Sequence, residues 1–211
     1  SFPDGKIRPT EFDRQRGEIA YGYRRDAHIF ELGYTRNETG NTGTPTLPMD
    51  IDYFDGDLFR ANYAYAGDSW SINTQLNASE LVHGMTNYHL RPAPQSPTQR
   101  RQNTTDVDNL GLHFTAQRDD NLGHWLFGAD YQQEEHNGLI DNPNNPMFFV
   151  EGFNNASREV VGVFVEREHR LTDSLVTEIG LRVNYVTSDA DAVDATPCLL
   201  YTSPSPRDMW T

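Results

Sequence analysis

Apolar and polar residues alternate with a period of two in eight separate runs along the chain. This pattern is typical of β-strands that have one apolar and one polar face. In a clear example, the apolar positions are Leu110, Leu112, Phe114 and Ala116, and the polar or small positions are Asn109, Gly111, His113 and Thr115. No segment shows a sustained helical period. The sequence therefore predicts an all-β chain.

The connections between these runs alternate strictly between short and long. The short ones are polar, turn-forming segments at 24–27, 67–69, 118–123 and 170–174. The long ones are rich in Asn, Pro, Gly and Thr and cover 37–55, 79–106 and 136–158. In an up-and-down antiparallel sheet, this order places all short turns at one end and all long loops at the other. Outer-membrane barrels have this arrangement, whereas a soluble domain rarely carries three long structureless loops.

Eight strands can close a small barrel, but the sequence favours a different interpretation. Residues 1–10 have the composition of the end of another long loop, and no residue marks a natural start or end of a barrel. We therefore expect residues 1–190 to form about eight antiparallel, up-and-down strands of a large transmembrane β-barrel.

The alternation stops after Val186, and we expect residues 191–211 to form a non-barrel tail. From about Cys198, the sequence looks like translated adaptor read-through in assembled environmental DNA. A genuine Pro-rich outer loop is the alternative. In either case, Cys198 is the single cysteine, so the chain has no internal disulfide and no cysteine-based zinc site.

Composition narrows the possible functions. The mean hydropathy of −0.71 suits a soluble protein and equally a barrel with a polar interior. A net charge of −14 argues against a nucleic-acid partner, which requires a basic surface. The chain contains no apolar stretch long enough for a transmembrane helix. It also lacks a phosphate-binding loop, a nucleophile elbow and a zinc-protease helix, so we predict that it is not an enzyme.

Several stretches in the predicted loops resemble TonB-dependent outer-membrane receptors, and more narrowly the branch that includes copper receptors. They are 44–51 (TPTLPMDI), 83–92 (HGMTNYHLRP), 100–106 (RRQNTTD) and 142–146 (NPNNP). A strand segment at 180–183 (GLRV) is also similar to these receptors. The resemblance covers about residues 10–190.

The resemblance implies a barrel of about 22 strands whose lumen is filled by an N-terminal plug. It also implies that the protein lies in the outer membrane of a Gram-negative bacterium. The partners that it implies are membrane lipid, the plug, the TonB complex and a metal or metal-chelate ligand. We expect the plug and the TonB-contacting box to lie outside these residues. The chain then supplies part of the wall and cannot transport alone.

The candidate metal-binding motif of the chain is His83-x-Met85. Imidazole and thioether groups suit copper, and positions i and i+2 of a strand point to the same side. The resemblance implies that this pair from the barrel binds a copper ion together with a Cys-x-x-x-Met pair from the plug. Packing without metal is the alternative, and no other cofactor is indicated. Weaker candidate ligands in neighbouring loops are Met49, Asp50, Asp52 and His89.

Two further histidines, His113 and His124, fall on the polar faces of their strands, where they line the path, contact the plug or face a hydrated lumen. Three functions are consistent with the pattern. The first is an energy-coupled receptor for a metal ion or metal chelate, with copper as the specific candidate. The second is a passive porin or channel, and the third is a soluble β-sandwich binding module.

Overall fold

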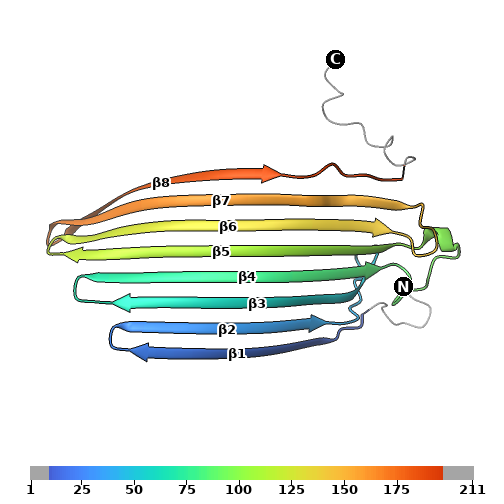
Figure 1. Ribbon diagram of the computed structural model, residues 1–211, viewed down its shortest axis with the longest axis horizontal. Helices are drawn as coiled ribbons and strands as arrows, with labels where there is room; N and C mark the ends of the chain where they lie inside the picture. The colour runs from blue at the N-terminus through green and yellow to red at the C-terminus, as the bar shows by residue number, and fades with distance from the viewer. Residues whose placement is uncertain (1–9, 197–211) are drawn as a thin grey trace, which may run out of the picture.

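The computed structural model describes residues 10–196, which form a single antiparallel sheet of eight strands. Each strand pairs with the next one in the chain (Figure 1). The strands are β1 (Arg14–Arg25), β2 (His28–Thr39), β3 (Asp50–Ala66), β4 (Trp70–Thr86), β5 (Gln102–Asp120), β6 (Gly123–Asp141), β7 (Phe149–Thr172) and β8 (Leu175–Asp189). One short 3₁₀ helix, η1 (Pro97–Gln99), lies between β4 and β5. The predicted all-β, up-and-down architecture is confirmed.

Short turns lie at one end of the sheet and longer loops at the other (Figure 1). The longer loops are residues 40–49, 87–101 and 142–148. The predicted order of short and long connections is therefore confirmed, but the predicted extent of the long loops was wrong. About half of the residues assigned to loops at 37–55, 79–106 and 136–158 continue the strands. After β8, residues 190–196 continue beside β7, where Ala195 forms an isolated antiparallel bridge with Val150. The tail predicted to be an artefact from Cys198 lies outside the described residues.

Backbone pairing explains why the strands continue past the alternating runs. The pairing of β4 with β5 is unbroken from Trp70 opposite Arg118 to Thr86 opposite Gln102. Side chains near the loop end are polar on both faces, as at Asp108 and Asn109, so the hydrophobic period disappears there. The ladder hydrogen bonds do not depend on that period and extend to the strand ends.

The apolar face of the sheet has an unbroken row of apolar residues across all eight strands. Residues that pair directly across neighbouring strands point to the same face. One such row contains Tyr21, Leu32, Ala61, Leu76, Leu112, Tyr131, Val161 and Tyr185. Most of its large side chains are exposed, including Leu112 at 41% and Tyr185 at 69%. An apolar surface of this size marks a contact with lipid or with another protein.

The polar face has the opposite composition in the neighbouring register. One row across the eight strands contains Gly22, Glu31, Asn62, Gln75, His113, Asp130, Gly162 and Asn184. Every member is polar or a glycine. The two adjacent rows show that the sheet separates two environments over its full width.

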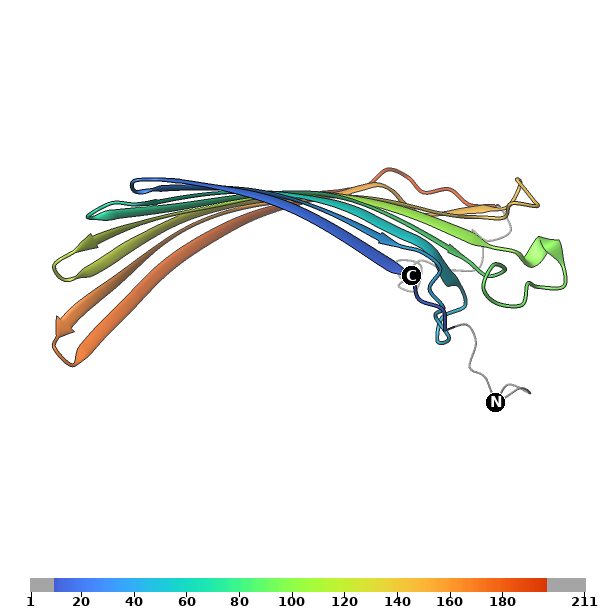
Figure 2. The ribbon, with the colours of Figure 1, turned by 90° about the horizontal axis from the view of Figure 1, so that it is seen from below.

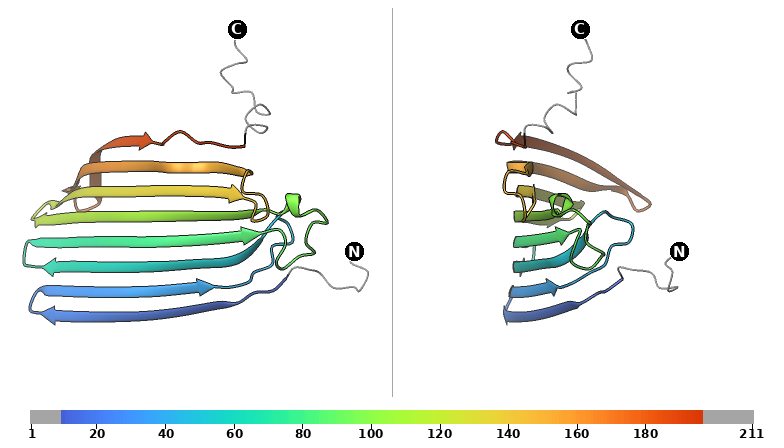
Figure 3. Two further views of the ribbon diagram at one scale, coloured as in Figure 1. Left: turned by 45° about the vertical axis from the view of Figure 1, so that its right-hand side comes forward. Right: turned by 90° about the vertical axis from the view of Figure 1, so that its right-hand side faces the viewer.

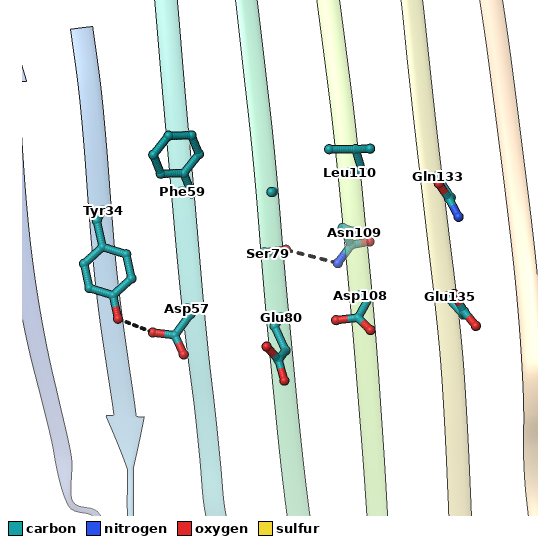
Figure 4. A pocket seen from close by; sticks show the side chains of 11 residues that line it. Tyr34, Asp57, Phe59, Ser79, Glu80, Asp108, Asn109, Leu110, Gln133 and Glu135 are labelled. Carbon is teal, nitrogen blue, oxygen red and sulfur yellow. Dashed lines mark hydrogen bonds between the residues drawn. The ribbon is translucent and has the colours of Figure 1, made fainter.

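Four carboxylates end the apolar band on the loop side of the apolar face. Asp57, Glu80, Asp108 and Glu135 pair directly across β3 to β6 (Figure 4). Like charges directly opposite one another repel, so this row requires an aqueous environment. Arg36 forms an ion pair with Asp57 at the edge of the row. The apolar band therefore stops below this level, and the outer parts of the strands extend beyond it.

The sheet is curved and twisted rather than flat, as Figure 2 shows. Oblique and end-on views show the three longer loops gathered beyond the same end of the strands (Figure 3). Strands β1 and β8 each have one edge without a partner strand within residues 10–196. No helix in this part of the chain has the length and hydropathy of a membrane span.

The turn between β5 and β6 depends on a glycine. Gly123 has φ +147°, a conformation that L-residues rarely adopt. A Cβ at this position would lie 2.1 Å from the backbone oxygen of Glu168. Gly111, in the middle of β5, has no such restriction, because its nearest neighbour would lie 4.0 Å away.

We therefore expect Gly123→Ala to destabilise the protein by about 1–3 kcal/mol, because it adds backbone strain and a steric clash. Gly111→Ala is the matched control and should change the unfolding free energy little. Thermal unfolding of the whole protein in detergent measures both. Equal unfolding temperatures for the two variants would contradict this account of the turn.

Candidate functional site

The predicted ligands His83 and Met85 lie at the loop end of β4. Strand β4 pairs with β5 without a register shift, so both residues share the polar face with Asn77. His83 lies opposite Thr105, and Met85 lies opposite Asn103. One nitrogen donor and one sulfur donor are thus presented side by side on the polar face.

The imidazole of His83 has an unsatisfied nitrogen. Its Nε2 atom is buried and has no hydrogen-bond partner among the described residues. Its ring packs edge-on against Phe54, with 5.5 Å between the ring centroids. A buried polar atom without a partner is unfavourable and calls for an explanation, such as a ligand that occupies the site. The donors present therefore fit a soft or borderline metal ion.

The weaker candidates Met49 and His89 lie at the same end of the β3–β4 hairpin. Met49 directly precedes β3, and its backbone oxygen accepts a hydrogen bond from the Thr44 hydroxyl. His89 contacts Asp52, with 3.1 Å between Nδ1 and Oδ1. No group of three or more His, Cys, Asp or Glu side chains within residues 10–196 is arranged to hold a metal ion.

Asp50, a predicted candidate ligand, is already fully bonded. Its side chain is completely buried, and Arg91 donates to it from Nε at 2.7 Å and from Nη2 at 2.8 Å. The backbone N–H of Thr44 donates a third hydrogen bond at 2.8 Å. Arg91 also donates to the backbone oxygen of Leu47 at 2.9 Å. This Asp50–Arg91 pair joins loop 40–49 to loop 87–101 and leaves no carboxylate oxygen for a metal.

Asp50 is a strong acid in this position. Burial alone would raise the pKa of the Asp50 carboxyl. The hydrogen bonds from Arg91 and Thr44 outweigh this effect and hold the pKa below its usual value. The carboxylate is therefore charged at neutral pH and keeps Arg91 in place.

The third long loop is attached to the second. Asn142 is buried, and its Nδ2 atom donates to the backbone oxygens of Pro97 at 3.2 Å and Thr98 at 2.9 Å. The guanidinium of Arg101 lies over the ring of Phe148 at 3.7 Å from its centroid. Together with the Asp50–Arg91 pair, these contacts join the three long loops into one unit, which we call the loop platform.

Arginine–carboxylate bridges cross the polar face near both edges of the sheet. On one side, Arg60 of β3 passes Gly33 of β2 and donates to Glu18 of β1 at 3.0 Å. A Cβ at Gly33 would lie 3.6 Å from Arg60 Nη2, which is an ordinary van der Waals distance, so this bridge does not require the glycine.

The second bridge lies near the other edge. Arg182 of β8 passes Gly162 of β7 and donates to Asp130 of β6 at 2.6 Å. A Cβ at Gly162 would lie only 2.6 Å from Arg182 Nη2. Sequence reasoning missed both bridges. The arginine and the carboxylate of each bridge are far apart in the chain, so the pattern of the sequence gives no direct signal for them.

Comparison with known proteins supports a β-barrel. A family model described as "TonB dependent receptor-like, beta-barrel" matches residues 4–210. Among 27 solved chains that resemble this one is a "Copper transporter OprC", with a TM-score of 0.72 and 17% sequence identity. The match covers 88% of this chain and 32% of that structure, so this chain spans about a third of its length. No curated protein matches the chain.

We expect Asp50→Asn to loosen the loop platform, because it leaves the Arg91 charge without its buried partner. Loss of one member of a buried pair costs about 3 kcal/mol. Limited proteolysis of the whole protein should then cut faster within 40–49 and 87–101. Asp26→Asn, at a short turn where the side chain is 88% exposed, is the control and should not change the cutting rate.

The same pair predicts an acid effect with a defined sign. A carboxyl whose folded pKa is lowered stabilises the fold above its unfolded pKa of about 3.9. That stabilisation is lost as the pH falls through the folded value. Proteolysis of the platform in the unmodified protein should therefore rise below about pH 4. An identical acid response in Asp50→Asn would contradict the assignment.

Proposed function

Since this chain belongs to the TonB-dependent receptor-like β-barrel family, we propose that it forms part of the wall of a receptor that takes up a metal ion or metal chelate. Copper is the cargo that its residues suit best. The family consists of outer-membrane receptors and transporters rather than enzymes. The metal and its binding residues are the proposed part of this assignment.

The different compositions of the two faces support an orientation in which the apolar face contacts lipid. On β5 the alternating run 110–116 has seven residues, roughly 23 Å at about 3.3 Å per residue. This is close to the apolar band of outer-membrane barrels, about 25 Å tall. The apolar face therefore contacts lipid, and the polar face lines the lumen. In a closed barrel, the free edges of β1 and β8 are paired with further strands.

The alternative functions fit less well. A soluble β-sandwich packs two sheets face to face, but residues 10–196 form one sheet whose apolar face is uncovered. A passive porin has the same strand physics as a receptor. Membership of the TonB-dependent receptor family favours energy-coupled uptake over passive diffusion.

The copper proposal rests on the buried Nε2 of His83, which has no hydrogen-bond partner within residues 10–196, beside the thioether of Met85. Imidazole and thioether together select copper over magnesium or calcium, which prefer oxygen ligands. Thioether is a soft ligand, so the reduced cuprous ion is the favoured form. A protein named as a copper transporter has a similar fold, at 17% identity. The Cys-x-x-x-Met pair implied by the resemblance would complete the coordination from the plug.

Copper binding by the full-length receptor tests the proposal. Cuprous ion is titrated anaerobically against a chromogenic competing chelator, with His83→Ala and Met85→Ala as test variants. Loss of a residue that only supports a ligand can weaken metal binding by about 100-fold. Loss of a direct ligand should weaken copper binding by more than this. His169→Ala and Met147→Ala are the matched controls. Met147 lies in loop 142–148 with 77% exposure, and His169 lies on the apolar face.

The controls should bind copper as the unmodified receptor does. Equal copper stoichiometry and affinity in His83→Ala, Met85→Ala and the controls would reject the site. Folded protein is verified in each case by the altered electrophoretic mobility of the unheated barrel.

A further inference from the structure

The seven histidines of the chain divide into two classes according to the face they occupy. Two lie on the apolar face near the short turns, and neither pairs with a carboxylate of the described part of the chain. His28 Nδ1 lies 3.0 Å from the hydroxyl of Tyr63, and His169 Nδ1 lies 3.4 Å from Arg167 Nη2. The other five lie on the polar face or in the loop platform.

Three polar-face histidines on β5 and β6 each have one carboxylate nearby, and two of them contact it directly. His113 Nδ1 contacts Asp130 Oδ1, and His136 Nε2 contacts Glu134 Oε1. The third, His124, has its Nδ1 atom 3.7 Å from Glu168 Oε1, which is beyond hydrogen-bond distance, so this carboxylate supports the imidazole only electrostatically. His89 in the loop platform has the same kind of partner, as described above. Among these five histidines, only His83, beside Met85, has no carboxylate partner within residues 10–196.

A carboxylate partner leaves one imidazole nitrogen ready to bind a cation. It holds the proton on the nitrogen that it contacts, so the other nitrogen carries the lone pair. That second nitrogen has no partner among residues 10–196 in His113, His124 or His136. The side chains are accessible, with exposures of 43%, 31% and 34%, respectively.

The bridge from Arg182 to Asp130 also holds the His113–Asp130 pair in place. Asp130 contacts His113 through one carboxylate oxygen and Arg182 through the other. The Arg182 guanidinium also lies 5.4 Å from the centroid of the Phe164 ring. These residues line a hollow of about 680 Å³, which gives a hydrated ion access to the imidazole.

The three pairs are spaced along the strands. His136 and His124 lie twelve residues apart on β6, and Asp130, the partner of His113, lies midway between them. At about 3.3 Å per residue, successive pairs are roughly 20 Å apart. They extend from just below His83, near the loop platform, to the short turns.

We propose that His136, His113 and His124 are weak, transient cation stations along the lumen wall. The cation taken up at His83 and Met85 passes them on its way to the short-turn end. This inference rests on the proposed function and extends it from capture to passage. Of the roles considered for His113 and His124, which were lining the path, contacting the plug and facing a hydrated lumen, it assigns the first.

Weak binding is what such a path requires. An ion must bind well enough to enter each position and weakly enough to leave it. Each station offers one imidazole nitrogen with a supporting carboxylate, and no three such groups converge within residues 10–196. The stations thus lack the ligand number of a storage or structural metal site. Between them the ion moves by diffusion in water.

The test compares copper uptake with copper binding in the full-length receptor. The variant with His113→Gln, His124→Gln and His136→Gln should take up copper about tenfold more slowly in energised cells, the lower end of what loss of metal-handling residues costs. Its tight binding at His83 and Met85 should be unchanged. His28→Gln with His169→Gln is the matched control and should transport at the normal rate. Normal uptake by the triple variant, or an equal loss in the control, would overturn the proposal.

Direct binding gives a second readout that does not depend on uptake. In a His83→Ala, Met85→Ala background, cupric ion is titrated and weak nitrogen coordination is followed by electron paramagnetic resonance. The signal should be present in this background and lost when the three station histidines are changed to Gln. Its persistence without them would reject the stations, whereas tight binding that survives in the background rejects only the proposed copper site. If the triple variant does not fold, the three single variants carry both measurements.

Discussion

A strand that faces hydrocarbon must satisfy every backbone hydrogen bond inside its own sheet, because lipid offers no partner. The unbroken ladder from β1 to β8 meets this requirement, and it fixes which residues share a face. Directly paired positions form an apolar row through Leu112 and a polar row through His113. A shift of one residue in any pair of strands would place charges such as Asp130 in lipid. The pairing register therefore determines both the membrane surface and the residues available inside.

Sequence alternation predicted this architecture well where the two faces differ. Runs such as 110–116 gave the strands and their faces, and the turn residues gave the order of connections. The prediction failed where the strands leave the apolar band, because residues such as Asp108 and Asn109 are polar on both sides there. Backbone pairing continues through these positions without leaving a hydrophobic period in the sequence.

The candidate site was predictable in part, for a related reason. The two-residue spacing of His83 and Met85 was sufficient to place them on one side of a strand. Other features depend on residues that the fold brings together from distant parts of the chain. Asp50 was assigned as a loop carboxylate, but Arg91, 41 residues later, buries and occupies it. The carboxylate partners of the polar-face histidines likewise became visible only when the register placed Asp130 opposite His113.

Site-by-site accessibility along β5 tests the central claim that one face contacts lipid and the other contacts water. Single nitroxide labels are placed at each position of 109–115 in the full-length receptor, reconstituted in bilayers. Relaxation by oxygen, which concentrates in lipid, should be strong at Leu110, Leu112 and Phe114. Relaxation by a water-soluble nickel complex should be strong at the positions between them. Uniform access to nickel along the whole run, or the opposite phase, would contradict the account.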